Sequence, residues 1–263
     1  MPGPEQALTV LVTGGTGALG RQVVEQLREK GHRAVIFSRR PGQGDWVQGD
    51  LATGAGLAEA VRGMDAVVHA GSATTQPWRY RATDVEGTRR LLRLAREAGV
   101  RHLVYVSIVG MEGVRYPYYR HKLAAEAVVN EGIAPWSILR ATQFHTLLEI
   151  FLDGMSRLPG LMLVPFAWRF QPVDTHDVAA RLVQLVSQEP GGLLPDFGGP
   201  EVRAFKEVAL SYRAARRWRK RIANLPLPFQ FSRRFAEGAL LCPEHRDGTI
   251  TWEQYLERRY GKW

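Results

Sequence analysis

The stretch TGGTGALG, residues 13–20, lies between an apolar run rich in β-branched residues, TVLVT (Thr9–Thr13), and a helix pattern that ends at Gly31. Its glycines fit both G-x-G-x-x-G and G-x-x-G-x-x-G. Such a turn needs backbone angles that a Cβ forbids, and it lets a pyrophosphate reach bare backbone and the free N–H groups of a helix N-terminus. Because the motif follows a strand and opens a helix, it predicts a dinucleotide site rather than a structural glycine turn. The residues expected to hold the pyrophosphate are Gly14, Gly15, Thr16, Gly17, Ala18, Leu19 and Gly20.

Strand and helix patterns alternate through the first 190 residues. The expected strands are 9–13, 33–38, 45–51, 65–71, 100–107 and 135–142, and the expected helices include 21–31, 83–98, 122–132 and 175–188. Near-continuous apolar strands that alternate with helices predict an α/β fold of the Rossmann type, with a doubly wound parallel sheet. The later chain reads as short helices. We therefore expect an NAD(P)-binding Rossmann domain at 1–190 and a small, mostly helical C-terminal part on the substrate side at 191–263.

The composition is that of an ordinary globular protein, with 263 residues of which 45% are hydrophobic and 23% charged. A net charge of +9 raises nucleic acid as a partner. The densest basic run, Arg213–Arg221, has helical character and reads as a solvated helix face, with an anionic substrate or a partner protein as alternatives. Charge alone does not predict nucleic-acid binding, so the expected partner is a small-molecule substrate. The oligomeric state is left open.

Cysteine content and apolar runs narrow the class of protein further. Cys242 is the only cysteine, which excludes an intrachain disulfide and an all-cysteine metal site. No apolar run reaches the ~18 residues that span a bilayer, and the first residues lack the layout of a secretory signal. No group of His, Asp and Glu has metal-ligand spacing. We therefore expect a cytoplasmic protein without a membrane segment or a metal.

The end of the second expected strand indicates which dinucleotide binds. An NAD-specific site places Asp or Glu about 20 residues beyond the glycines, where it binds the ribose 2′-hydroxyl. Here that position reads Ser38, Arg39 and Arg40, without an acid. Arginine makes forked, charge-assisted bonds to phosphate, and serine can join them. NADP(H) is the predicted cofactor, with NAD(H) as the alternative if the arginines are only exposed loop residues.

TGGTGALG is followed by SRR (Ser38–Arg40), GDL (Gly49–Leu51), HAG (His69–Gly71) and YVS (Tyr105–Ser107). Together these motifs resemble the short-chain dehydrogenase/reductase superfamily over residues 8–190, and the proportions are similar to its atypical NmrA-like and triphenylmethane reductase-like branch. The resemblance implies that Asp50 and Leu51 meet the adenine. It implies that the stretch Ala70, Gly71 and Ser72 lies along the cofactor and that the segment 140–144 borders the nicotinamide. Taken alone, Asp50 could instead cap the following helix.

Tyr118 and Lys122 form the pattern Y-x-x-x-K, whose two side chains share a face of a helix. A lysine charge can depress the pKa of a tyrosine, ordinarily ~10, so that the phenol exchanges a proton near neutral pH. In the resembled superfamily this pair does that work, and the lysine also binds the nicotinamide ribose. An ordinary amphipathic helix start is the alternative, and Tyr116 and Tyr119 are rivals for the proton. The superfamily's serine is matched by Ser107, which lies early, and Val109 cannot replace it.

These observations predict an NADP(H)-dependent oxidoreductase that transfers hydride between the nicotinamide and a small organic substrate of the carbonyl, quinone or enone type. The expected walls of its substrate site are Trp168, Phe170 and the segment PLPF at 226–229. His145, His121 and His176 read as structural histidines. The alternative is a non-catalytic NADP-binding sensor of the NmrA-like type, which the early serine favours and the intact Y-x-x-x-K pair opposes.

Overall fold

Seven strands form one parallel sheet in the computed structural model, which describes residues 6–263. The strand order is β3-β2-β1-β4-β5-β6-β9, so the winding reverses next to β1, the strand that leads into the glycine turn. In an open α/β sheet, ligands bind beyond the carboxyl ends of the strands at this reversal. The strands are β1 (Thr9–Thr13), β2 (Arg33–Ser38), β3 (Trp46–Gln48), β4 (Ala66–His69), β5 (His102–Ile108), β6 (Trp136–Ala141) and β9 (Gly192–Leu193).

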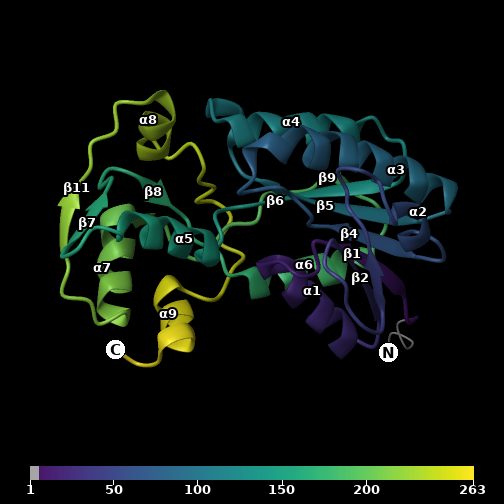
Figure 1. The fold of residues 1–263 in the computed structure, drawn as a ribbon, viewed down its shortest axis with the longest axis horizontal. Helices are drawn as coiled ribbons and strands as arrows, with labels where there is room; N and C mark the ends of the chain where they lie inside the picture. Colours follow the sequence, from purple (N-terminus) through teal and green to yellow (C-terminus); the bar gives the residue numbers. More distant parts are fainter. Residues whose placement is uncertain (1–5) are drawn as a thin grey trace. The chain divides into compact units, whose positions relative to one another are not determined.

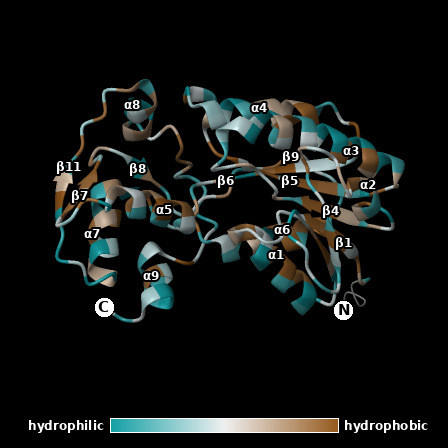
Figure 2. Cartoon of the chain, in the orientation of Figure 1, coloured by the Kyte–Doolittle hydropathy of each residue, from teal (hydrophilic) through white to brown (hydrophobic). Residues whose placement is uncertain are grey.

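Helices cover both faces of this sheet, with α3 and α4 on one side and α1 and α6 on the other (Figure 1). The helical elements are α1 (Ala18–Glu29), α2 (Leu57–Ala60), η1 (Pro77–Arg79), η2 (Arg81–Glu86), α3 (Gly87–Glu97), α4 (Pro117–Asn130) and α6 (Thr175–Val186). The hydrophobic colours of Figure 2 gather on the strands between these layers. One buried cluster joins Leu11, Val67 and Leu103 of the sheet to Leu91 of α3 and Val128 of α4.

The chain divides into two compact units that interleave along the sequence. Unit 1 comprises residues 1–107, 117–139 and 179–195, and unit 2 comprises 108–116, 140–178 and 196–263. Unit 2 contains two two-stranded sheets, β10 with β8 and β11 with β7. Its elements are η3 (Met111–Gly113), α5 (His145–Met155), β7 (Leu161–Val164), β8 (Arg169–Phe170), β10 (Arg203–Ala204), α7 (Phe205–Ala215), β11 (Arg221–Asn224), α8 (Gln230–Ala236) and α9 (Trp252–Tyr260).

The Rossmann-type fold predicted from sequence is confirmed, and the structure differs from the expectation in three places. The division between units does not follow the sequence boundary at residue 190, because segments 108–116 and 140–178 pack with the C-terminal residues. The short strand β9 was not expected, since two residues give no periodicity. The basic run Arg213–Arg221 is not one helix: α7 ends at Ala215, and Arg217 takes a left-handed φ of 52°. Within residues 6–263 no helix is long and apolar enough to cross a membrane.

Candidate active site

The glycine turn joins β1 to α1, and three of its four glycines are required by the fold itself. Gly14 has a φ of +70°, and a Cβ there would lie 2.8 Å from the Cα of Gly71. A Cβ at Gly15 would lie 2.9 Å from the side chain of Ile36, and one at Gly20 would lie 2.2 Å from the carbonyl oxygen of Gly14. These positions keep the turn tight and let α1 begin directly beside the strand ends.

Gly17 is different, because the fold gives no reason for a glycine there. It is exposed, and it caps α1 with φ −78° and ψ 175°, angles that any residue adopts. A Cβ would meet only the Gly14 carbonyl oxygen, at 3.2 Å. The helix N-terminus that it opens carries no side-chain cap and no acidic residue in its first turn. Bare backbone at an uncapped helix N-terminus fits a pyrophosphate.

The other predicted cofactor residues lie around this turn. Gly71 donates its N–H to Thr13 Oγ1 at 3.1 Å, and a Cβ at Gly71 would lie 2.7 Å from Leu51 Cδ1. Thr16 Oγ1 lies 3.4 Å from Ser38 Oγ at the end of β2. The structure therefore brings the glycine turn, Ser38, Leu51 and the stretch 70–72 together within unit 1.

Arg39 and Arg40 follow Ser38 on an exposed loop. The guanidinium of Arg39 donates to Gln76 Oε1 at 3.4 Å. The backbone carbonyl of Arg40 accepts from the Trp46 indole at 2.8 Å, which orders the loop, while its guanidinium contacts no acceptor in the described part of the chain. Two cationic side chains are thus available beyond the end of β2, where a 2′-phosphate needs them.

Asp50 is held by an arginine that the sequence analysis missed. Arg79, in η1, donates to both carboxylate oxygens of Asp50, at 2.7 and 2.5 Å, and the Ala52 N–H donates to Oδ1 at 2.9 Å. Burial acts to raise the pKa of Asp50, but the bonds from Arg79 and Ala52 and the nearby charges of Arg79 and Arg39 outweigh it and lower the pKa. Asp50 is thus a carboxylate that accepts the Ala52 N–H within its own turn, and it does not cap a helix.

Tyr118 lies in the first turn of α4 with its ring buried, at 8% exposure. Its hydroxyl lies 2.9 Å from Ser72 Oγ and 3.4 Å from Thr74 Oγ1, just beyond the end of β4. Burial first, and then the charge of Asp84, raise the pKa of Tyr118 to about 12. The structure therefore brings Tyr118 to the predicted cofactor stretch 70–72, but as a phenol that holds its proton.

Lys122, one helical turn later, is buried and points at β5. Its ammonium donates to the Tyr105 hydroxyl at 2.6 Å and to the Val106 carbonyl at 2.8 Å. Burial lowers the pKa of Lys122 to about 8, against the opposing charges of Asp84 and Glu126. The expectation that Lys122 depresses the pKa of Tyr118 is wrong for this structure, because the ammonium is directed at Tyr105 while burial and the charge of Asp84 raise the pKa of Tyr118.

A directed chain of buried hydrogen bonds fixes the end of β4. Burial lowers the pKa of His69 to about 3, so its ring is neutral and has one donor and one acceptor. Thr13 Oγ1 lies 2.7 Å from His69 Nδ1, and His69 Nε2 lies 2.9 Å from Thr88 Oγ1. Thr88 Oγ1 donates to the carbonyl of Asp84 at 2.5 Å, so it accepts from Nε2–H, and Nδ1 accepts from Thr13. This chain positions the backbone of Asp84.

Ser107 lies inside β5 rather than beyond it. Its side chain is buried, and its hydroxyl has no hydrogen-bond partner among the described residues. It shares the strand with Tyr105, which holds Lys122. The structure does not bring Ser107 into hydrogen-bond contact with Tyr118, a place that Ser72 takes instead. Sequence reasoning placed Ser72 along the cofactor without linking it to Tyr118, because 46 positions separate the two residues.

The residues expected around a substrate belong to unit 2. Phe170 is fully buried, and Trp168 donates its indole N–H to Ser232 Oγ at 2.8 Å. His145 is buried, with Nδ1 3.4 Å from Asp174 Oδ2 and its ring against Trp252. Phe170 therefore packs inside its own unit, as a core residue does. His121 and His176 bond or approach neighbours in their own helices.

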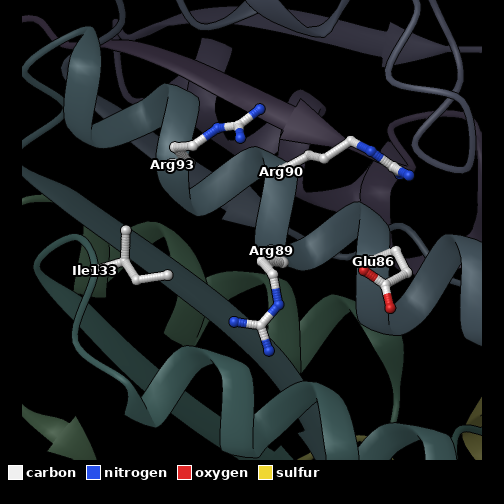
Figure 3. Close-up of a pocket in the computed structure, with 5 residues that line it drawn as sticks. All are labelled: Glu86, Arg89, Arg90, Arg93 and Ile133. Carbon is white, nitrogen blue, oxygen red and sulfur yellow. The ribbon is translucent and has the colours of Figure 1, made fainter.

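A pocket of about 480 Å³ opens elsewhere in unit 1 and contains none of the predicted site residues. Figure 3 shows three arginines of α3 around it. Arg89 is already held by both carboxylate oxygens of Glu131. The pocket is lined by Glu86, Arg89, Arg90, Arg93 and Ile133. Across residues 6–263 no cluster of His, Cys, Asp and Glu is able to hold a metal ion.

Known proteins resemble this chain in sequence and in fold. The profile of a family described as NAD(P)H-binding matches residues 14–149. A (4-alkanoyl-5-oxo-2,5-dihydrofuran-3-yl)methyl phosphate reductase of Streptomyces griseus is 30% identical over 84% of this chain and 76% of its own length. A 3-beta-hydroxysteroid dehydrogenase of Mycolicibacterium neoaurum is 35% identical over 37% of this chain, and the chain spans only 31% of that relative. The structure of a short-chain dehydrogenase/reductase superfamily protein from Agrobacterium tumefaciens with bound NAD has a TM-score of 0.73, 24% identity and 95% coverage of both chains.

Proposed function

We propose that this chain, which belongs to the NAD(P)H-binding family, is an NADP(H)-dependent oxidoreductase for a small organic substrate of the carbonyl, quinone or enone type. One observation carries the proposal: the Tyr118 hydroxyl lies 2.9 Å from Ser72 Oγ, at the end of the strand next to β1 and its glycine turn. A phenol that could exchange a proton thus lies beside the stretch expected to line the dinucleotide. The relative from Streptomyces griseus, whose name is that of a reductase, supports the same class of chemistry.

The preference for NADP(H) is supported by charge. The end of β2 carries Ser38, Arg39 and Arg40 where an NAD-specific site has an acid, and the Arg40 guanidinium contacts no acceptor in residues 6–263. A 2′-phosphate would receive charge-assisted bonds from these side chains. The proportions of the chain favour the NmrA-like branch of the short-chain dehydrogenase/reductase superfamily, and a cytoplasmic location remains a prediction.

In this proposal the chain's own residues bind, orient and exchange a proton. The nicotinamide supplies or accepts the hydride when it is bound. Tyr118 exchanges the proton with the substrate oxygen. An ammonium has three donors, and two of those of Lys122 are taken by Tyr105 and Val106, so one is left for a ribose hydroxyl. The main proposed role of Lys122 is therefore to bind the ribose.

A second candidate is a non-catalytic NADP-binding sensor. The observation that favours it is the position of Ser107, whose hydroxyl does not reach Tyr118. The buried contact between Tyr118 and Ser72 opposes it, because nucleotide binding alone does not require a phenol there.

Replacing Tyr118 by Phe separates the two functions. We expect Tyr118→Phe to reduce NADPH oxidation with a panel of ketones, quinones and enones by about 10²–10⁴-fold, the usual range of general acid–base catalysis, and to leave NADPH affinity nearly unchanged. Tyr119→Phe is the matched control, since Tyr119 is the adjacent, equally buried tyrosine of α4. Tight NADPH binding without turnover on any substrate would favour the sensor. Turnover that survives Tyr118→Phe would leave the chain an enzyme with another proton donor.

A further inference from the structure

Asp84 is a buried carboxylate that the proposed mechanism does not yet use. It lies in η2 at 1% exposure. Ser72 Oγ donates to its Oδ1 at 2.5 Å, and the Ala73 N–H donates to its Oδ2 at 3.2 Å. In the described part of the chain no arginine, lysine or histidine forms an ion pair with it. Burying a carboxylate is costly, so this placement requires a compensating set of donors, and Ser72 and Ala73 supply it.

The carboxylate fixes the direction of the next hydrogen bond. A serine hydroxyl has a single proton, and an ionised carboxylate can only accept. The Ser72 proton is therefore given to Asp84, and the lone pairs of Ser72 Oγ face the Tyr118 hydroxyl at 2.9 Å. In this contact Tyr118 must be the donor. Tyr118 thus donates a hydrogen bond to Ser72, and Ser72 donates one to Asp84, because the carboxylate of Asp84 can only accept.

We propose that Asp84, acting through Ser72, holds Tyr118 as a protonated donor, so that the resting site is ready to deliver a proton to its substrate, as reduction requires. The inference rests on the proposed function and adds the protonation state from which reduction starts. Asp84 is a positioning residue, because it reaches the substrate only through two other side chains. For a carbonyl substrate, the carbon receives the hydride from NADPH with its electron pair, and the C=O π bond breaks. The oxygen takes the Tyr118 proton, and Tyr118 regains a proton from water.

The other groups around Tyr118 do not reverse the direction of its hydrogen bond to Ser72. The Tyr80 ring, from the segment before η2, lies 5.2 Å from the Tyr118 ring, and that of Tyr119 lies 6.0 Å away. Thr74 Oγ1 is a weaker partner at 3.4 Å. The Lys122 ammonium is engaged by β5. Burial and the charge of Asp84 raise the pKa of Tyr118 to about 12, and the hydrogen bonds with Ser72 and Thr74 act against this rise without cancelling it.

Asp84→Asn tests the inference without any substrate. The amide oxygen can keep the bond from Ala73, and the amide nitrogen then donates to Ser72 Oγ, which frees the Ser72 proton to point at Tyr118. Loss of the charge of Asp84 and the reversed bond should together raise the ionisation constant of Tyr118 about tenfold or more. NMR titration of isotope-labelled tyrosine measures this in the full chain, with Tyr118→Phe identifying the resonance.

Glu126→Gln is the matched control, because Glu126 is a second buried carboxylate of this unit whose charge acts on Tyr105 and Lys122. It should leave the Tyr118 titration unchanged. An Asp84→Asn variant that titrates like the wild type would overturn the inference. If Asp84→Asn does not fold, Ser72→Ala decides: removing an acceptor should leave the ionisation constant of Tyr118 unchanged or higher, whereas a tenfold decrease would mean that Ser72 was donating to Tyr118.

Activity gives an independent readout. With any substrate found in the Tyr118→Phe assay, the titration of Lys122 near pH 8 acts on reduction by both proteins, and reduction by Asp84→Asn should show a further decline at higher pH as Tyr118 ionises. An identical pH profile for both proteins would refute the role of Asp84. Absence of turnover would count against the proposed function only, since the tyrosine titration needs no turnover.

Discussion

Gly17→Val places a branched side chain where the structure leaves backbone open. Gly17 has β-region angles at the N-cap of α1, so valine introduces no backbone strain. Its Cβ would lie 3.2 Å from the Gly14 carbonyl oxygen, a contact that a shift of a few tenths of an ångström relieves. Valine is a poorer N-cap than glycine, and we estimate a stability loss of about 1 kcal/mol, or about 2–4 °C in Tm.

The effect on the cofactor should be much larger. If the pyrophosphate lies against Gly17, the valine methyls hold it away from the N–H groups of the α1 N-terminus. Hydrogen bonds to charged groups contribute about 1.5–3 kcal/mol each. Loss of two corresponds to about 3 kcal/mol or more, which weakens NADPH binding about a hundredfold or more.

Calorimetric titration with NADPH and thermal unfolding of the same samples measure both effects. Gly154→Val in α5 is the control, because it adds the same side chain at a glycine with no heavy atom within 4 Å of the added Cβ. It should leave NADPH affinity unchanged. A folded Gly17→Val protein whose affinity stays within a factor of about two would show that the pyrophosphate binds elsewhere.

Two further predictions concern charge. Arg39→Ala should narrow the preference for NADPH over NADH by about 1–3 kcal/mol, measured by titration with both nucleotides, and equal affinities in the wild type would remove the argument. Burial lowers the pKa of Lys122 to about 8 from its ordinary 10.5, so between these values the unfolded chain binds more protons than the folded one. Stability should therefore gain from this group as pH rises through that window, by about 3 kcal/mol in total, and the burial cost is fully present below pH 8. Lys122→Met should lose this gain, and parallel unfolding curves against pH for both proteins would contradict it.

The fold was predictable because its signals are local and repeated. Each of the strands β1, β2, β4, β5 and β6 is an apolar run bounded by turn residues, and α1 ends at Glu29, two residues before Gly31, which has a φ of +81°. Strand β9 was not predicted because a strand of two residues shows no hydrophobic periodicity. The division into two units was not predicted because it depends on which distant segments pack together. No change in composition marks residues 140–178 as part of unit 2.

The site could be predicted from sequence where a motif encodes backbone geometry. It was less predictable where it depends on which distant side chains contact one another. The glycine turn, Ser38 and the stretch 70–72 lie together in the structure, and their role in holding a dinucleotide stays a prediction. The partners of Asp50 and Tyr118, namely Arg79 and Asp84, follow from folding the segment 72–88 back onto the strand ends. An acid in an amphipathic helix pattern reads as exposed, so only the structure reveals that Asp84 is buried under Ser72.

The interleaving of the two units bears on how this protein can be engineered. The chain passes between them at five points, and three of these points lie inside an element, namely the strands β5 and β6 and the helix α6. No single truncation releases unit 2 whole, since removing residues 196–263 leaves 108–116 and 140–178 behind without their packing partners. A chimera that keeps this nucleotide-binding half and takes its other half from a relative would need three grafted segments, two of them internal. Recombination with a relative at a single crossover should therefore give misfolded chains, because it divides unit 2 between the two parents. Substitutions inside either unit do not meet this problem.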